Sequence, residues 1–175
     1  MKKSIKRLVS SIMVLSLLII PLSSMYSNAL TMMKNDKDIV QIATDDGRFN
    51  TLVEALKSAG LVDTLKGEGP FTVFAPTDDA FNKLPQGTIQ DLLKPENKET
   101  LTNILLYHVA KGNLSAKDIV NLDGKELTLQ NGKTAKVTVK NGEVFINDAK
   151  VIITDIKANN GVIHVIDTVL IPKYE

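Results

Sequence analysis

Cysteine and tryptophan are both absent from this 175-residue chain. Without cysteine the chain has no disulfide, no thiol nucleophile and no thiolate metal ligand, so its core alone must stabilise the fold. Aromatic residues are few, with five phenylalanines and three tyrosines. A surface on which sugar rings or nucleobases stack therefore has few candidate side chains.

Motifs of catalysis and metal binding are also missing. The sequence contains no Gly-x-Ser-x-Gly and no glycine-rich phosphate loop, and neither histidine has an obvious serine or carboxylate partner nearby. Asp45, Asp46 and Gly47 lack the regular oxygen spacing of a calcium loop. We therefore predict a protein that is not an enzyme, with no catalytic residue, no metal and no cofactor.

The N-terminal segment, residues 1–29, is typical of a secretory signal peptide. It begins with four basic residues, continues with an apolar run over 8–20 that Pro21 interrupts, and ends in the small-x-small pattern of Ser27 and Ala29. The apolar run is shorter than the roughly 20 residues of a membrane-spanning helix. We predict cleavage after Ala29 and a secreted protein at the cell surface or outside the cell. An uncleaved membrane anchor is the alternative.

The charge of the remaining chain argues against nucleic-acid binding. Four of the 21 basic residues lie in the predicted signal peptide, so 17 remain against 20 acidic residues. A nucleic-acid surface needs a clustered basic excess. The final residues, VLIPKYE, are not a hydrophobic tail, so we expect no stable membrane span after cleavage.

The apolar pattern changes period along the chain. Helical spacing extends over 39–60 with Gly60 as its end, a capping-box pair of Thr88 and Asp91 precedes a second helix, and a third is predicted over 98–110. Three Asn-Gly dipeptides, beginning at 131, 141 and 160, then separate strand-like runs. We predict an α+β domain over 38–173, with helices packed on a small, twisted, largely antiparallel sheet, after a flexible lead-in at 30–37.

The stretch GPFTVFAPTDDAFNKLP, residues 69–85, predicts a strand followed at once by a helix. Thr77 or Asp78 can cap the first N–H groups of that helix, and Asp79 lies in the positive field of its first turn. Adjacent carboxylates on a helix point roughly 100° apart, which does not suit paired acid–base catalysis. We therefore assign Thr77, Asp78 and Asp79 a structural role.

Three segments together resemble the signature of the fasciclin-type adhesion domain: FTVFAPTDDAFNKLP, then YHVAKG, then NGVIHVIDTVLIP. The resemblance covers residues 36–172 and implies a single secreted binding module. Members of that family chiefly bind integrins, matrix or polysaccharide. We therefore predict adhesion to a cell-surface protein, a matrix protein or a polysaccharide. Some relatives bind an apolar pigment, so an extracellular carrier of an apolar small molecule such as a carotenoid is the alternative.

The resemblance also implies a contact region at Tyr107 and His108. Helical spacing places His108 on the apolar face formed with Leu101, Ile104 and Leu105, and Tyr107 toward the flank. A neutral core histidine, hydrogen-bonded to the Thr77-Asp78 turn of the resembled fold, is the structural interpretation. The two interpretations are compatible if the histidine shapes a surface that a partner touches.

A second implied contact is Asp155 with Ile156, which occupy the position of an integrin-binding Asp-Ile pair in animal relatives. A strand-end aspartate beside a buried isoleucine is the plainer interpretation. His164 shares a strand face with Val162 and Ile166, which predicts a packed or edge position. Asn113-Leu114-Ser115 is a glycosylation sequon, although a helix cap formed by Ser115 with Asp118 is preferred.

Export gives the first testable prediction. Cleavage after Ala29 leaves a chain that begins at Leu30, because signal peptidase accepts small residues at the positions of Ser27 and Ala29. N-terminal sequencing of the extracellular protein checks this. A membrane-held species that retains Met1 would contradict it.

Overall fold

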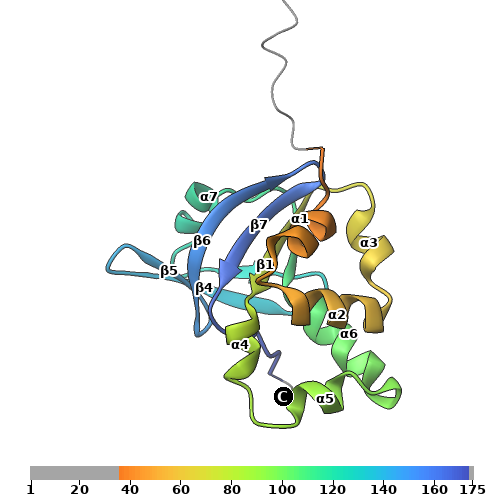
Figure 1. The fold of residues 1–175 in the computed structure, drawn as a ribbon. Helices are drawn as coiled ribbons and strands as arrows, with labels where there is room; N and C mark the ends of the chain where they lie inside the picture. Colours follow the sequence, from red (N-terminus) through yellow and green to blue (C-terminus); the bar gives the residue numbers. More distant parts are fainter. Residues whose placement is uncertain (1–35, 174–175) are drawn as a thin grey trace, which may run out of the picture. The chain divides into compact units, whose positions relative to one another are not determined.

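The computed structural model describes residues 36–173 (Figure 1). The predicted signal peptide, 1–29, lies outside the described residues, as does most of the lead-in at 30–37. Of that lead-in, the carbonyl oxygens of Asp36 and Lys37 accept hydrogen bonds from the side chain and the backbone of Asn159, respectively, both at 3.0 Å. Within residues 36–173, no helix is long and apolar enough to cross a membrane.

The first predicted helical run is two helices, α1 (Ile39–Asp46) and α2 (Asn50–Ala59), followed by the short α3 (Val62–Lys66). Gly47 ends α1 with φ of 76°, and Gly60 ends α2 with φ of 74°. Both conformations suit glycine, because a Cβ atom disfavours positive φ. The predicted stop at Gly60 is confirmed, and Gly47 adds a break that the apolar spacing does not show.

The middle of the chain forms α4 (Asp78–Asn82), α5 (Thr88–Leu92), a 3₁₀ turn (Pro95–Asn97) and α6 (Lys98–Leu106), and α7 (Ala116–Val120) follows later. The predicted capping box on α5 is wrong: its N-cap is Gly87, and Asp91 pairs with Lys94 at 2.7 Å. The predicted helix over 98–110 ends early, at Leu106. Its last residues form a strand, because they pair with a neighbouring strand instead of continuing the helix.

The strands are β1 (Phe71–Pro76), β2 (Val109–Lys111), β3 (Glu126–Thr128), β4 (Thr134–Lys140), β5 (Glu143–Ile146), β6 (Ala149–Ala158) and β7 (Gly161–Ile166). Within residues 36–173 they form one seven-stranded sheet in the order β2-β1-β7-β6-β5-β4-β3. An antiparallel bridge between Ala110 and Leu129 brings its two edges together, so the sheet is nearly closed on itself. The α+β prediction is confirmed, but the sheet is larger than predicted. It is also mixed, since β1 and β7 run parallel.

The Asn-Gly dipeptides have different roles. Asn141 and Gly142 have φ of 54° and 79° and join β4 to β5 as a two-residue hairpin, as predicted. The turn between β6 and β7 is Asn159-Asn160, one residue earlier than the dipeptide suggests. Gly161 already belongs to β7, where a Cβ atom would lie 2.0 Å from the carbonyl oxygen of Phe71. This glycine is required for the close approach of two backbones.

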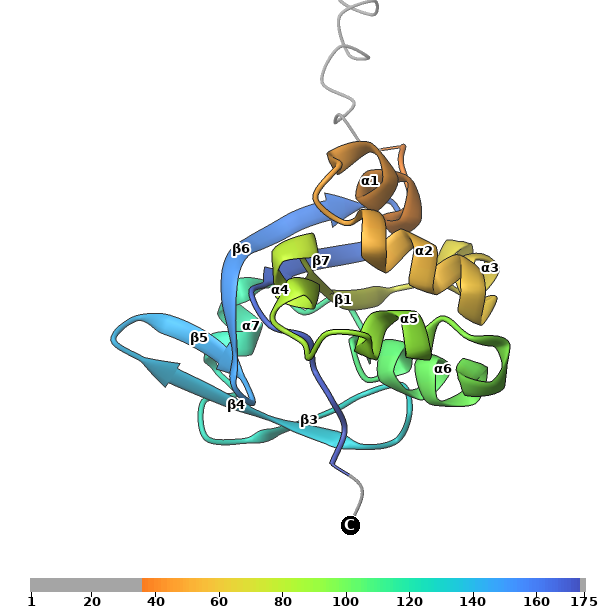
Figure 2. The same ribbon diagram turned by 60° about the horizontal axis from the view of Figure 1, so that its bottom comes forward.

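Two apolar cores lie on opposite faces of the central strands. Helices α1 to α6 gather on one side of β1 and β7, and β3 to β5 lie on the other (Figures 1 and 2). The first core joins helical residues such as Phe49 and Leu105 to Val73 of β1 and Val165 of β7. The second core fills the interior of the curved sheet, with members that include Phe74, Tyr107, Ile119, Val137, Ile146 and Ile166.

Candidate functional site

His108 lies in the turn between α6 and β2 and is 2% exposed. Its Nδ1 donates to the carbonyl oxygen of Ile104 at 2.8 Å, and its Nε2 accepts from the backbone N–H of Leu170 at 2.9 Å. A carbonyl can only accept and an amide can only donate, so the two partners require the neutral ring with its proton on Nδ1. Burial lowers the pKa of His108 from 6.5 to about 4, although the hydrogen bond to Ile104 acts in the opposite direction.

The partner predicted for His108 is therefore wrong. The Thr77-Asp78 turn does not bind this ring, whose two nitrogens contact only main-chain groups. The predicted flanking position of Tyr107 is also wrong, because α6 ends at Leu106 and the Tyr107 ring packs in the second core at 4% exposure. Its hydroxyl donates to the carbonyl oxygen of Thr134 at 2.7 Å and accepts from the Asn147 amide at 3.0 Å. A contact role for Tyr107 and His108 stays a prediction, and their burial restricts it to shaping the surface.

His164 occupies the middle of β7, between β1 and β6, and is fully buried. Its Nε2 donates to the carbonyl oxygen of Leu114 at 2.8 Å, and its Nδ1 accepts from the backbone N–H of Asp155 at 3.3 Å. The ring stacks on Phe74 with 5.9 Å between centroids. Of the two predicted positions, the structure shows the packed one. Burial lowers the pKa of His164, and the Leu114 hydrogen bond and the Asp155 charge oppose this change.

Asp155 lies inside β6, not at the strand end that the sequence suggested. The register with β7 shifts between Ile153 and Ile156, which is a β-bulge, and Asp155 adopts a left-handed conformation with φ of 61°. Its exposed carboxylate accepts from the backbone N–H of Ala116, the first residue of α7, at 2.9 Å. Ile156 is partly buried against the first core. A contact role for this pair also stays a prediction.

The two neighbouring aspartates of the first signature segment have separate environments. Thr77 caps α4 by accepting from Ala80 N at 3.2 Å. The carboxylate of Asp78 instead caps α2: it accepts from the backbone of Thr51 at 2.8 Å, and from the backbone and side chain of Asn50 at 3.4 and 3.1 Å. Burial raises the pKa of Asp78, but these hydrogen bonds together outweigh it and leave the pKa lowered. Asp79 is exposed.

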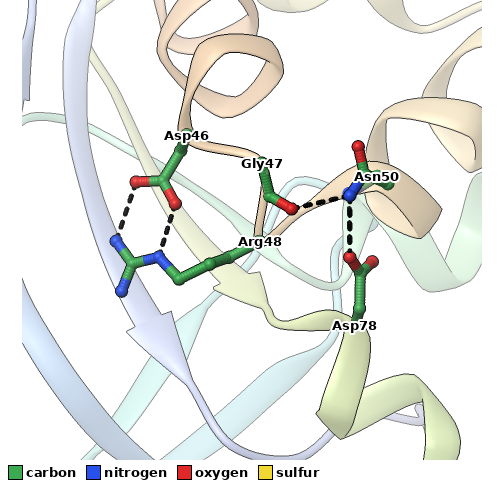
Figure 3. Close-up of polar contacts among 5 residues, drawn as sticks. All are labelled: Asp46, Gly47, Arg48, Asn50 and Asp78. Atoms are coloured by element: carbon green, nitrogen blue, oxygen red, sulfur yellow. Dashed lines mark hydrogen bonds and ion pairs between the residues drawn. The ribbon is translucent and has the colours of Figure 1, made fainter.

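Figure 3 shows how Asp78 reaches Asn50, the first residue of α2, next to the loop that joins α1 to α2. Within that loop, Asp46 forms an ion pair with Arg48, and the Asn50 side chain also donates to the carbonyl oxygen of Gly47 at 2.6 Å. The Arg48 guanidinium lies 5.6 Å from the centre of the Phe49 ring. Asp78 thus connects the end of β1 to a loop that is distant in sequence, which is a structural role.

The cap predicted on α7 is confirmed. The Ser115 hydroxyl accepts from the Asp118 N–H, and the Asp118 carboxylate accepts from the Ser115 N–H at 2.9 Å. Asn113 of the sequon is exposed, and its glycosylation stays a prediction.

Among the described residues, no group of three histidine, cysteine or acidic side chains could hold a metal ion. The hydrogen bonds of His108, His164 and Asp155 are all to main-chain atoms, and those of Asp78 are mainly so, which means that these side chains support the backbone.

Polar side chains that the sequence did not predict as contacts line an open hollow of about 550 Å³ where three loops meet: the loop between α3 and β1, the loop between β2 and α7, and the turn between β6 and β7. Its lining includes Lys66, Glu68, Asn113 and Asn159, together with Gly67, Gly69 and Pro70. A smaller hollow of about 310 Å³ lies between α1 and α2 and is lined by Thr44, Asn50, Val53, Glu54 and Lys57. The sequence signal for the first hollow is a set of turn residues, Gly-Glu-Gly-Pro and Asn-Asn, which mark loops without showing that they converge.

Comparison with known proteins gives the family. A model of the fasciclin domain matches residues 47–172, so the chain belongs to the fasciclin-domain family. It is 49% identical over 139 residues to "Protein sll1483" of Synechocystis, across 77% of this chain and 73% of that protein. It is 39% identical to the "Cell surface glycolipoprotein MPB83" of Mycobacterium bovis, across 77% of this chain and 60% of that protein.

A solved structure shares the fold. A pair of FAS1 domains from the insect cell adhesion molecule Fasciclin I matches with a TM-score of 0.70 at 22% identity, across 79% of this chain and 52% of that chain.

Replacing Asp78 and Asp79 one at a time tests whether the two aspartates have different structural roles. Asp78→Ala removes the acceptor for the first N–H groups of α2, so we expect it to lower the free energy of unfolding by about 1–2 kcal/mol. Asp79→Ala is the matched control, and we expect a change within about 0.5 kcal/mol because its carboxylate is exposed. Urea unfolding of both variants measures this. Equal effects of the two replacements would contradict the assignment.

His108 predicts a loss of stability in acid. Its folded pKa of about 4 lies below the ordinary value of 6.5, so the unfolded chain takes up the proton first. The free energy of unfolding then falls as the pH drops from about 6.5 to 4, by roughly 3 kcal/mol through this residue. Urea unfolding between pH 7 and 4 measures the slope, and His108→Gln removes this ring's share. A His108→Gln profile parallel to that of the wild type would contradict the prediction.

Proposed function

We propose that this protein is a secreted adhesion module that attaches to a polar partner: a cell-surface protein, a matrix protein or a polysaccharide. Membership of the fasciclin-domain family supports a binding role. The names of two matching proteins, a cell surface glycolipoprotein and a cell adhesion molecule, agree with it. Secretion rests on the pattern of residues 1–29.

The single structural observation that supports a polar partner is the larger hollow. Lys66, Glu68 and Asn113 line it and are exposed. Together they offer a positive charge, a negative charge, and hydrogen-bond donors and acceptors. Hydroxyl groups of a saccharide and the main chain of a protein loop are partners of matching chemistry. Loops held by a rigid sheet are also a common place for binding residues.

The apolar-carrier alternative receives less support. A pigment site is expected to be an enclosed, mostly apolar pocket. Both hollows are open, and polar side chains are half of the lining residues of the larger hollow and four of the five of the smaller one. Mass spectrometry of the protein purified from its own host would reveal a bound pigment and favour this alternative.

Attachment of coated beads tests the adhesion proposal. Beads that carry the purified mature protein should bind to cells and to the extracellular polysaccharide of the source organism, because both present polar groups. The double variant Glu68→Ala with Asn113→Ala should reduce attachment several-fold. The variant Thr44→Ala with Glu54→Ala alters the smaller hollow and is the matched control, which should attach normally.

The possible results distinguish a failure of the adhesion proposal from a wrong choice of contact surface. Wild-type beads that attach no better than albumin-coated beads would overturn the adhesion proposal. Attachment that is equal for the wild type and both variants would support adhesion but exclude the larger hollow as the contact surface. Melting temperatures of the variants show whether each is folded.

A further inference from the structure

His164 connects two neighbouring parts of the surface through one buried ring. Its Nε2 donates to Leu114, the residue before the N-cap of α7, and its Nδ1 accepts from Asp155 in the β6 bulge. The Asp155 carboxylate then accepts from Ala116 at the start of α7. These three hydrogen bonds together connect the β6 bulge to the start of α7.

The ladder between β6 and β7 is interrupted at the bulge, between Ile153 and Ile156, and the segment before α7 is also held by a hydrogen bond from the Leu114 N–H to the Thr72 hydroxyl at 2.9 Å. Helix α7 has five residues, of which only Ile119 is buried. The ladder between β5 and β6 covers Lys150 and Ala149 and does not reach the bulge. Two exposed apolar side chains, Val120 at 43% and Ile152 at 46%, lie on these same two elements. Local opening costs least where buried contacts are few, so this region, whose main contribution to the second core is Ile119, can open before the rest of the two cores does.

The neutral state of His164 is a geometric requirement. Both partners are main-chain groups, so Nε2 must donate and Nδ1 must accept. A proton on Nδ1 would face the N–H of Asp155, and rotating the ring would place the other N–H in the same position. The protonated ring therefore cannot keep both hydrogen bonds.

We propose that His164 is a pH-sensitive clamp: its neutral ring holds the β6 bulge and α7 together, and uptake of a proton in mild acid releases them as a local unit. The clamp acts through Asp155 and Leu114, so His164 is a positioning residue. This proposal goes beyond the adhesion proposal and does not depend on it.

The charged groups around the clamp are few. Strand β1, on one side of β7, contains no titratable residue. Near the bulge, β6 carries Asp155 and Lys157, and α7 carries Lys117 and Asp118. The Asp155 charge favours the protonated ring, whereas burial of the ring opposes it more strongly. The hydrogen bonds from Ser115 lower the pKa of Asp118, so this carboxylate does not titrate in the pH range of an opened histidine.

Amide hydrogen exchange of the ¹⁵N-labelled mature protein at pH 7 and pH 5 tests the clamp. After correction for the intrinsic pH dependence of exchange, the protection factors of Ala116 and Asp155 should fall at least about tenfold relative to those of Ile163 and Val165. The reason is that the opened form binds a proton with the ordinary histidine pKa of about 6.5, whereas the closed form resists it.

Three variants assign the effect. His164→Gln should make the protection of Ala116 and Asp155 independent of pH over this range. His108→Gln is the matched control, since that ring binds Ile104 and Leu170 instead, and it should keep the wild-type response. Asp155→Asn retains an acceptor for Ala116 but removes the charge, and it should also keep the response, which excludes titration of Asp155 itself.

Side-chain ¹⁵N shifts of His164 give a readout that does not require a folded His164 variant. The wild type should show the proton on Nε2 at pH 7, which is the tautomer that the carbonyl of Leu114 and the N–H of Asp155 require. A ring with its proton on Nδ1 at pH 7 would overturn the proposal, because it could not accept from Asp155. A parallel fall at Ile163 and Ala116 would also overturn it, because it would show global unfolding instead of local release.

Discussion

The parallel pairing of β1 with β7 is the contact on which the rest of the structure depends. The two strands are far apart in sequence, yet they pair along their full length from Phe71 opposite Gly161 to Pro76 opposite Ile166. Alternation along them supplies one core on each face, with Val73 and Val165 toward the helices, and Phe74 and Ile166 toward the interior of the curved sheet. The close approach requires glycine at 161, since any Cβ would overlap the backbone of β1.

The central strands are buried on both faces. A polar side chain packed against them is therefore tolerated only where it forms hydrogen bonds, here with main-chain groups. His108 and His164 do so in the same way: each neutral ring accepts from one backbone N–H and donates to one carbonyl. An unsatisfied buried donor or acceptor would cost about 1–3 kcal/mol. Each ring thus joins two backbone segments that are not paired in the sheet. These segments lie in a turn, a bulge or a helix, where the regular hydrogen bonds between strands are interrupted.

The sequence predicts the local elements of this fold better than their long-range partners. The strand–helix junction at Thr77, the helix stop at Gly60 and the hairpin at Asn141 follow from backbone preferences that act within a few residues. The family resemblance adds the overall class of protein. The size of the sheet was missed because the short strands β2 and β3 have three residues each and carry little alternation.

The candidate site was harder to predict than the local elements, because its contacts join residues that are far apart in the sequence. The prediction from helical spacing required α6 to continue through Tyr107. Instead, Val109–Lys111 pairs with β1, so the helix ends before Tyr107 and the tyrosine side chain points inward. Asp78 shows the second difficulty: as a neighbour of Thr77 it should cap its own helix, yet its carboxylate caps α2 through Thr51, at a separation of 27 positions in the sequence. A contact of that separation is visible only once the fold is known.

These roles change what the signature segments say about binding. Their histidines and Asp78 stabilise the backbone of the domain, and Tyr107 is buried in its second core. A signature that specifies the fold does not specify a partner, because function lies in sites placed on a fold. Under the proposed function, partner choice would fall to exposed loops outside the tightly packed strands, where replacement costs little stability. The hollow at Lys66, Glu68 and Asn113 lies among such loops, so under the same proposal the contact surface can change while both cores stay the same.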